Sequence, residues 1–145
     1  MGGKYSQIYA HFVFSTKYRE PLIDSFFEER LYSYIREVGR FYGCTFIVCG
    51  GISDHIHVVV GFKPSITHSK IVQVIKSKSS KWLNDNFFPD RSFAWQSGYG
   101  VFSIDKRNLD RVINYVNNQK EHHKNQTFET EYSKILRRYK LELKE

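Results

Sequence analysis

The segment Asp54–Val60 constrains the fold more than any other part of the chain, because its two histidines lie among four aliphatic residues in a pattern typical of a β-strand. Side chains alternate between the two faces of a strand, so His55 and His57 share one face, opposite an aliphatic face that begins with Ile56. Two residues rise by about 6.5–7 Å, which lets both imidazoles converge on one metal ion. Strand histidines can also face solvent or be hydrogen-bonded in a core, but the shared face favours the metal site.

Length and charge limit the class of protein. A chain of 145 residues predicts one domain, residues 1–145, large enough to bury a core. The formal charge of +7 favours a polyanionic partner, nucleic acid before membrane. We find no signal peptide and no apolar stretch near the ~20 residues of a membrane span, so we expect a soluble cytoplasmic protein. Cys44 and Cys49 are an odd number apart on one predicted strand, which predicts opposite faces and free thiols.

Hydrophobic periodicity predicts four strands and four helices. The strands are expected at residues 5–16, 44–49, 54–62 and 93–104, with a turn at 50–53 and a bend near Gly98 and Gly100. The helices are expected from a capping box at Ser25 and Glu28 to Tyr42, and at residues 67–84, 108–124 and 127–143. The order β-α-β-β-α-β-α favours an α+β fold, a ferredoxin-like antiparallel sheet with helices packed on it.

The third predicted helix carries a second group of candidate residues. Tyr115 and Gln119 are four apart and therefore lie on one helix face, beside the apolar stripe, with His122 on the same flank. His123 is expected to point away. A tyrosine in such a position is most often a packing residue, but two imidazoles, an amide and a phenol are together suited to metal-assisted attack on a phosphodiester.

Two basic segments are candidates for DNA contacts. Residues 63–84 contain five lysines, Lys76 among them, and no acid before Asp85, with serines interleaved. Lys17 and Arg19 flank an aromatic residue that can stack on an unpaired base. Such runs are usually solvated faces, yet lysines and hydroxyls without acids also suit phosphate contacts, so we predict DNA binding by Lys17, Arg19 and Lys76.

Several motifs in order along nearly the whole chain resemble one family, the HUH single-tyrosine transposases of insertion sequences that move as single-stranded DNA, together with the related repeat-associated transposases. The similar segments are, in chain order, His11–Arg19, Asp54–His57, Lys76 with Ser79–Ser80, Trp95–Ser103 and Tyr115–His123. A histidine pair alone would be a weak signal, and the shared order makes the resemblance specific.

The resemblance implies a fold, a reaction and an assembly. It implies the HUH endonuclease fold, with His55, His57 and Gln119 holding a divalent metal, Mg²⁺ or Mn²⁺, and Tyr115 as the nucleophile. The implied enzyme is a transposase that cleaves and rejoins single-stranded DNA, with hairpin ends, through a 5′-phosphotyrosine intermediate. It also implies a homodimer in which each active site takes its tyrosine helix from the partner subunit.

Some alternatives stay open at this stage. The chain could be a non-catalytic module that binds single-stranded nucleic acid or hairpins, or a metal-dependent phosphodiesterase in which Tyr115 is structural. The residues do not identify the base that takes the phenolic proton, for which a water on the metal and His122 are candidates. No carboxylate has an obvious place among the metal ligands, since Asp54 is expected on the other strand face. A neutral ligand set predicts weak binding of Mg²⁺ or Mn²⁺ until DNA supplies negative charge.

Overall fold

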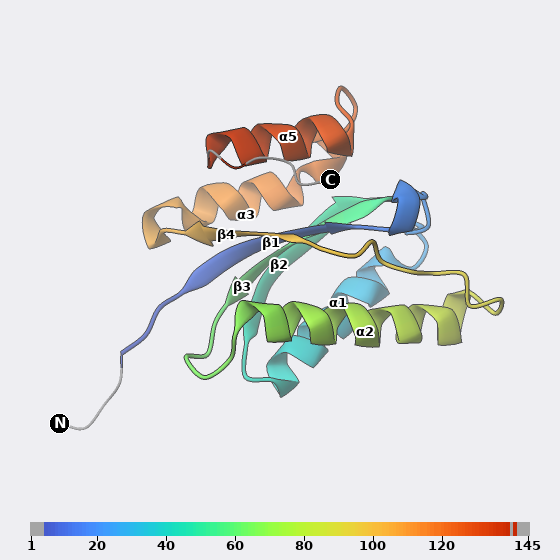
Figure 1. The fold of residues 1–145 in the computed structure, drawn as a ribbon, viewed down its shortest axis with the longest axis horizontal. Coiled ribbons are helices and arrows are strands. Elements are labelled where there is room, and N and C mark those ends of the chain that lie inside the picture. The colour runs from blue at the N-terminus through green and yellow to red at the C-terminus, as the bar shows by residue number, and fades with distance from the viewer. Residues whose placement is uncertain (1–4, 140, 142–145) are drawn as a thin grey trace.

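The sheet is the centre of the molecule. The computed structural model describes residues 5–139 and residue 141. Within them, four antiparallel strands lie in the order β2-β3-β1-β4 (Figure 1). The strands are β1 (Tyr9–Ser15), β2 (Thr45–Ile52), β3 (His55–Gly61) and β4 (Gly100–Ile104). This order, with β1 and β3 in the middle, confirms the predicted ferredoxin-like α+β sheet.

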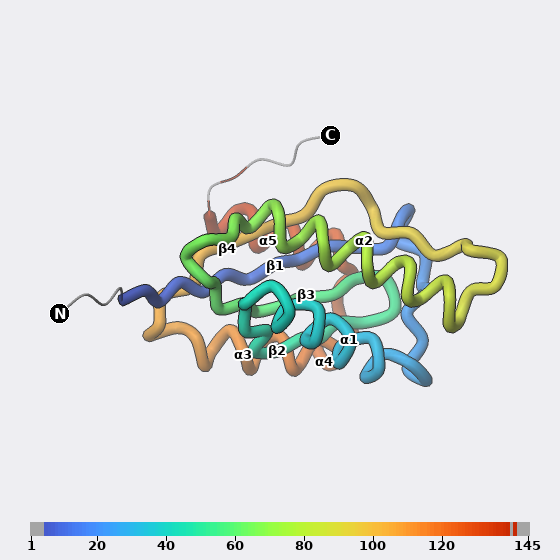
Figure 2. Tube along the Cα trace, turned by 90° about the horizontal axis from the view of Figure 1, so that it is seen from below, coloured from blue at the N-terminus to red at the C-terminus, as the bar shows by residue number. Residues whose placement is uncertain are grey.

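The helices form a layer on each face of the sheet (Figure 1 and Figure 2). The elements on one face are α1 (Glu28–Phe41) and α2 (His68–Phe87); those on the other are α3 (Leu109–Asn117), α4 (Gln119–His122) and α5 (Phe128–Arg138). Two 3-10 turns, η1 (Lys17–Arg19) and η2 (Lys106–Asn108), follow β1 and β4. Along the described residues, no helix combines the length and the apolar character that a membrane span requires.

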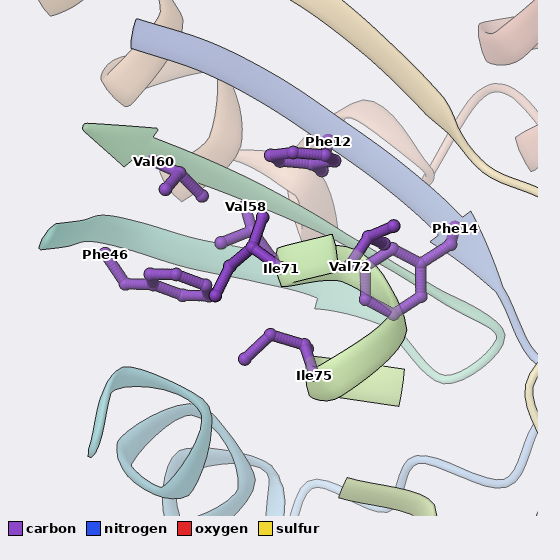
Figure 3. A pocket seen from close by; sticks show the side chains of 8 residues that line it. All are labelled: Phe12, Phe14, Phe46, Val58, Val60, Ile71, Val72 and Ile75. Carbon is purple, nitrogen blue, oxygen red and sulfur yellow. The ribbon is translucent and has the colours of Figure 1, made fainter. Parts of the chain in front are cut away.

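The face under α1 and α2 is filled with apolar side chains. Figure 3 shows eight of these side chains, from β1, β2, β3 and α2, around one small cavity. The cavity measures only about 10 Å³, which is at the lower limit for a single water molecule. This half of the molecule is therefore a packed core rather than a binding site.

The other face carries the histidines, because strand alternation sends neighbouring residues of β3 in opposite directions. Ile56 joins the core under α1 and α2, while His55 and His57 lie under α3–α5, and all three are fully buried. Gly50 of β2 pairs with His57, and a Cβ at Gly50 would come within 2.3 Å of the Val116 carbonyl oxygen. The missing side chain thus lets the backbone of α3 lie directly against the sheet, next to the histidine.

Several predicted boundaries were wrong. β1 begins at Tyr9 rather than at residue 5, and β2 continues to Ile52, so the turn before β3 is shorter than predicted. Residues 93–99 form a loop with one isolated bridge, from Trp95 to Thr16 just after β1, which leaves β4 only five residues long. The predicted capping box also fails, because α1 begins at Glu28 without a side-chain cap and the Glu28 carboxylate pairs with Lys120.

The predicted helix at 108–124 is interrupted at Asn118. α3 ends at Asn117, Asn118 has φ −103° and ψ 22°, and α4 begins at Gln119. The change of direction alters which side chains after Asn118 face the sheet. The last predicted helix ends at Arg138; the predicted continuation falls partly on residues 140 and 142–143, which lie outside the described residues.

A bulge changes the expected placement of the cysteines. The pairing of β2 with β3 shifts between Phe46 and Val48, so one extra residue enters the strand there. Cys44 and Cys49 therefore lie in the same apolar core, not on opposite faces as predicted. Both are free thiols, as expected, and burial raises the pKa of Cys49 to about 12.

Candidate metal and tyrosine site

Two histidines and one carboxylate converge under α5. His55 and His57 project from β3, and Glu131 projects from α5 toward them. The Glu131 Oε1 atom lies 3.3 Å from His55 Nε2 and 3.1 Å from His57 Nε2, and the ligand atoms of all three residues lie within 4.8 Å of one another. Two imidazoles with a carboxylate are a common donor set for a divalent transition metal, so these residues fit a metal site.

Two further residues orient the imidazoles. Asp54 Oδ1 accepts a hydrogen bond of 2.8 Å from His55 Nδ1, and His11 Nε2 lies 2.7 Å from His57 Nδ1. Burial, followed by the neighbouring His57, lowers the pKa of His11 to about 3, so His11 is neutral. Both contacts engage Nδ1 and leave Nε2 of each ligand directed at the site, as is usual around protein-bound metals.

The charges of the site compensate one another. Burial opposes a charge on His55, but its hydrogen bonds with Asp54 and Glu131 outweigh burial and raise its pKa to about 9. Burial likewise opposes ionisation of Glu131, but hydrogen bonds from His55 and His57 hold the pKa of this carboxyl far below its usual range. Without metal, the site therefore contains an imidazolium beside a carboxylate, and a metal ion must displace the imidazolium proton.

Tyr115 and Gln119 meet the histidines at the same carboxylate. The Tyr115 hydroxyl donates a hydrogen bond to Glu131 Oε2, and Gln119 Nε2 donates to the same oxygen over 2.8 Å. Gln119 Oε1 lies 3.0 Å from His55 Nε2. Burial, and next the contact with Glu131, raises the pKa of Tyr115, so the phenol is protonated at rest. The structure brings together all four predicted residues, Tyr115, His55, His57 and Gln119.

Glu131 was not among the predicted site residues, and His123 was predicted to point away from the site. No carboxylate was expected near the candidate ligands, yet Glu131 is 1% exposed and contacts both histidines. His123 does not point away: its Nε2 atom lies 3.0 Å from Glu131 Oε1 and 3.1 Å from Gln119 Oε1, as its spacing of four residues from Gln119 allows. The available signal was an acid at position 131 within the apolar stripe between Phe128 and Ile135, three residues from the first and four from the second.

The predicted DNA-binding residues differ in their surroundings. The Lys76 ammonium donates to the backbone oxygens of Gln96 and Gly98, over 2.6 and 2.8 Å, and burial lowers its pKa. Lys76 therefore fixes the loop at 96–98. Arg19 pairs with Glu129 of α5, and Lys17 is exposed, with its ammonium 5.4 Å from the Tyr18 ring centre.

Comparison with known proteins connects this geometry to one family. The family model "Transposase IS200 like" matches residues 4–119. The transposases of insertion sequence IS200 from Salmonella typhimurium and Salmonella typhi are each 27% identical to the chain over 120 residues, which cover 79% of this chain and 78% of theirs.

Two solved structures share the fold. One is a candidate transposase from Deinococcus radiodurans, with a TM-score of 0.66 and 19% identity, over 82% of this chain and 95% of that chain. The other is a REP-associated tyrosine transposase bound to a REP hairpin, with a TM-score of 0.63 and 13% identity, over 85% of this chain and 73% of that chain.

Proposed function

The chain belongs to the IS200-like transposase family, and from this premise we propose that it cleaves and rejoins single-stranded DNA through a 5′-phosphotyrosine intermediate. The observation that carries the proposal is that the Tyr115 hydroxyl and two buried histidines meet at one carboxylate, Glu131. A tyrosine that served only for packing would not need its hydroxyl directed at a metal-binding group. The cytoplasmic location stays a prediction from the sequence.

The donor set suits a divalent ion. His55, His57 and Glu131 would hold it, and the Gln119 amide oxygen is a fourth candidate ligand because it already faces His55 Nε2. We propose Mg²⁺ or Mn²⁺, which, when bound, would neutralise charge on the scissile phosphate and orient it. One carboxylate among the ligands supplies the negative charge that a neutral set would lack.

The side chains account for the nucleophilic step. The Tyr115 oxygen attacks phosphorus and its bond to hydrogen breaks; Glu131 Oε2, which accepts that hydrogen bond, orients the hydroxyl, and the proton leaves to solvent. The bond from phosphorus to the 3′-oxygen breaks, and the leaving oxygen takes a proton from solvent. Rejoining runs in reverse: a 3′-hydroxyl attacks the phosphotyrosine and Tyr115 recovers its proton. One ester replaces another, so no ATP is required.

The assembly proposal is a homodimer with shared active sites. Within one chain, the Tyr115 ring centre already lies 5.8 Å from that of His57. Exchange of α3–α5 between two chains would preserve the same contacts, as in domain swapping. Mixing Tyr115→Phe protein with His55→Ala protein tests the proposal, because sharing restores partial cleavage after subunit exchange. A monomer in light scattering, or no rescue after proven exchange, would show that each chain uses its own tyrosine.

A covalent adduct is the direct test of the function. Single-stranded oligonucleotides with hairpin ends are the first substrates to try, because the related REP-associated transposase was solved with a hairpin. We expect denaturing electrophoresis to show a protein–DNA species that requires Mg²⁺ or Mn²⁺ and disappears with a chelator. Cleavage products without an adduct would indicate a phosphodiesterase, and binding without cleavage would indicate a non-catalytic module.

A further inference from the structure

We propose that a groove between α5 and the loop at residues 96–100 binds an unpaired nucleotide of the DNA strand next to the cleaved phosphate. The inference rests on the proposed function, and the groove reaches Asp54, which hydrogen-bonds the metal-ligand candidate His55. The groove would determine where the strand lies and which side chains contact it, and the reacting groups alone do not determine either. The walls come from segments that lie far apart in sequence.

The groove is continuous and opens beside the metal site. Two cavities of about 940 and 530 Å³ lie along it. The residues that line both cavities are Ser15, Gln96, Ser97, Phe128 and Tyr132. The larger cavity is also lined by Asp54, which accepts the hydrogen bond from the metal-ligand candidate His55. A strand lying in the groove therefore passes within reach of the site.

A ladder of stacked rings leads from the metal site into the groove. The Phe128 ring stacks on the His55 ring with 4.3 Å between centres, and the Tyr132 ring stacks on Phe128 with 5.4 Å between centres and 16° between planes. Phe128 is buried, whereas Tyr132 is partly exposed and lines both cavities. The exposed face of Tyr132 offers a base a place to continue the ladder.

The opposite rim presents a second aromatic ring in a fixed position. Tyr18 has φ 57° and Arg19 has φ 53°, a left-handed conformation that non-glycine residues rarely adopt and that concentrates at functional sites. The Tyr18 amide donates to the Gln96 side-chain oxygen over 3.2 Å, and Arg19 pairs with Glu129 across the groove. These contacts hold the turn, yet the Tyr18 ring is 78% exposed.

The lining fits a nucleotide better than an apolar ligand. Aromatic faces on both sides suit a flat base, while Gln96 and Ser97 offer amide and hydroxyl groups to its edge. Lys17, exposed beside Tyr18, supplies positive charge for a neighbouring phosphate, whereas the Arg19 charge is paired with Glu129. The family match ends at residue 119, so the α5 wall is built by residues beyond the matched segment.

The test measures binding without cleavage, so that it does not depend on catalysis. A DNA hairpin with unpaired tails carries the fluorescent base 2-aminopurine at one tail position at a time, and is titrated with protein in the presence of a chelator. We expect one tail position to be quenched by stacking. Tyr18→Gly removes the ring while allowing the left-handed turn, and Tyr132→Leu removes the other ring while keeping an apolar side chain.

Both variants should weaken binding of the tailed hairpin by about 5- to 100-fold, abolish the quenching, and leave binding of the same hairpin without tails unchanged. Phe41→Ser is the matched control, because Phe41 is 83% exposed on α1, on the far side of the sheet. Quenching that persists in both variants, or an equal loss for the hairpin without tails, would overturn the proposal. Quenching by wild-type protein that never forms an adduct would support the groove while rejecting the catalytic proposal.

Discussion

The two faces of the sheet use the same strands for different purposes. Under α1 and α2, side chains of β1 and β3 form an apolar core around a cavity of only about 10 Å³. Under α3–α5, the same strands present His11, His55 and His57, which meet Glu131 and Gln119 in a buried polar cluster. Apolar burial stabilises a fold, whereas buried charges stabilise it little or not at all. Apolar clusters also attach α3 and α5 to the second face, so that face combines packing with the buried polar groups, whereas the first face serves apolar packing.

Tyr115→Phe should have the largest effect and should act only on the sheet face under α3–α5. The substitution removes the nucleophilic oxygen but keeps the ring, so we expect adduct formation to fall by about a thousandfold or more while folding is retained. Denaturing electrophoresis measures the adduct. Tyr34→Phe is the control, since Tyr34 stacks on Trp82 on the opposite side of the sheet. An adduct formed by the Tyr115 variant would identify a different nucleophile.

Ile56→Ala tests the apolar core under α1 and α2, at the residue that lies between the two histidines in the sequence. Ile56 is fully buried, so the cavity should lower the free energy of unfolding by about 2–5 kcal/mol, measured by urea denaturation. Mn²⁺ affinity of the folded variant should change little. Ile8→Ala is the matched control, because Ile8 is 57% exposed and the same change there should cost less than about 0.5 kcal/mol. Similar losses at both positions would contradict the division between the faces.

Glu131→Gln keeps the shape of the side chain but removes its charge. Loss of residues that only support metal ligands typically weakens affinity by about 10–100-fold, so loss of the ligand carboxylate should weaken Mn²⁺ binding by about 100-fold or more. Calorimetric titration measures this on protein without DNA. Glu129→Gln, on the exposed side of the same helix, is the control and should bind Mn²⁺ as the wild type does. Weak wild-type binding that tightens only with DNA would instead favour the neutral ligand set.

Metal affinity should rise with pH. The pKa of His55 is raised to about 9, so Mn²⁺ must displace its proton below that pH, and affinity should increase up to about tenfold per pH unit before levelling near pH 9. The stability of the metal-free protein should change in the opposite direction and fall as pH rises. A raised pKa stabilises the fold below the unfolded value of 6.5, and that contribution is lost as pH rises through about 9. Titrations from pH 6 to 9 measure both, and a pH-independent affinity would exclude His55 as the displaced group.

Lys17→Gln should have the smallest effect and should appear only in DNA binding. Lys17 is exposed at the rim of the groove, so losing one phosphate contact should reduce the log–log salt slope by up to about one unit. Lys76→Gln should leave the slope unchanged, because the Lys76 ammonium already holds two backbone oxygens. A reduced slope in the Lys76 variant would restore the original prediction of a direct DNA contact.

Local patterns predicted much of this arrangement. Alternation within β3 predicted the shared face of His55 and His57, and helical spacing placed Tyr115 and Gln119 together, because each pattern depends only on neighbouring residues. The predicted sheet followed from the order of the elements. Glu131 was missed, since its partners lie on β3 and α3, and an acid within the apolar stripe of α5 marks an unusual position without recording those contacts.

The errors have the same physical origin. The helix break at Asn118 and the bulge between Phe46 and Val48 are single-residue irregularities, and the bulge changed which side chains of β2 share a face. The loop at 93–99 contains strand-forming aromatic residues such as Trp95, which pack into the core without extending the strand ladder. Tertiary contacts decided these positions against local propensity.

The alternation along β3 also makes this protein intolerant of small insertions. β3 is paired along its length with both β1 and β2, and a shift of one residue would turn both histidines into the apolar layer and bring Ile56 to the site of the chemistry. One codon gained or lost in this strand would therefore abolish folding and strand cleavage together. Loss of the site without loss of the fold is not expected from a change of this kind.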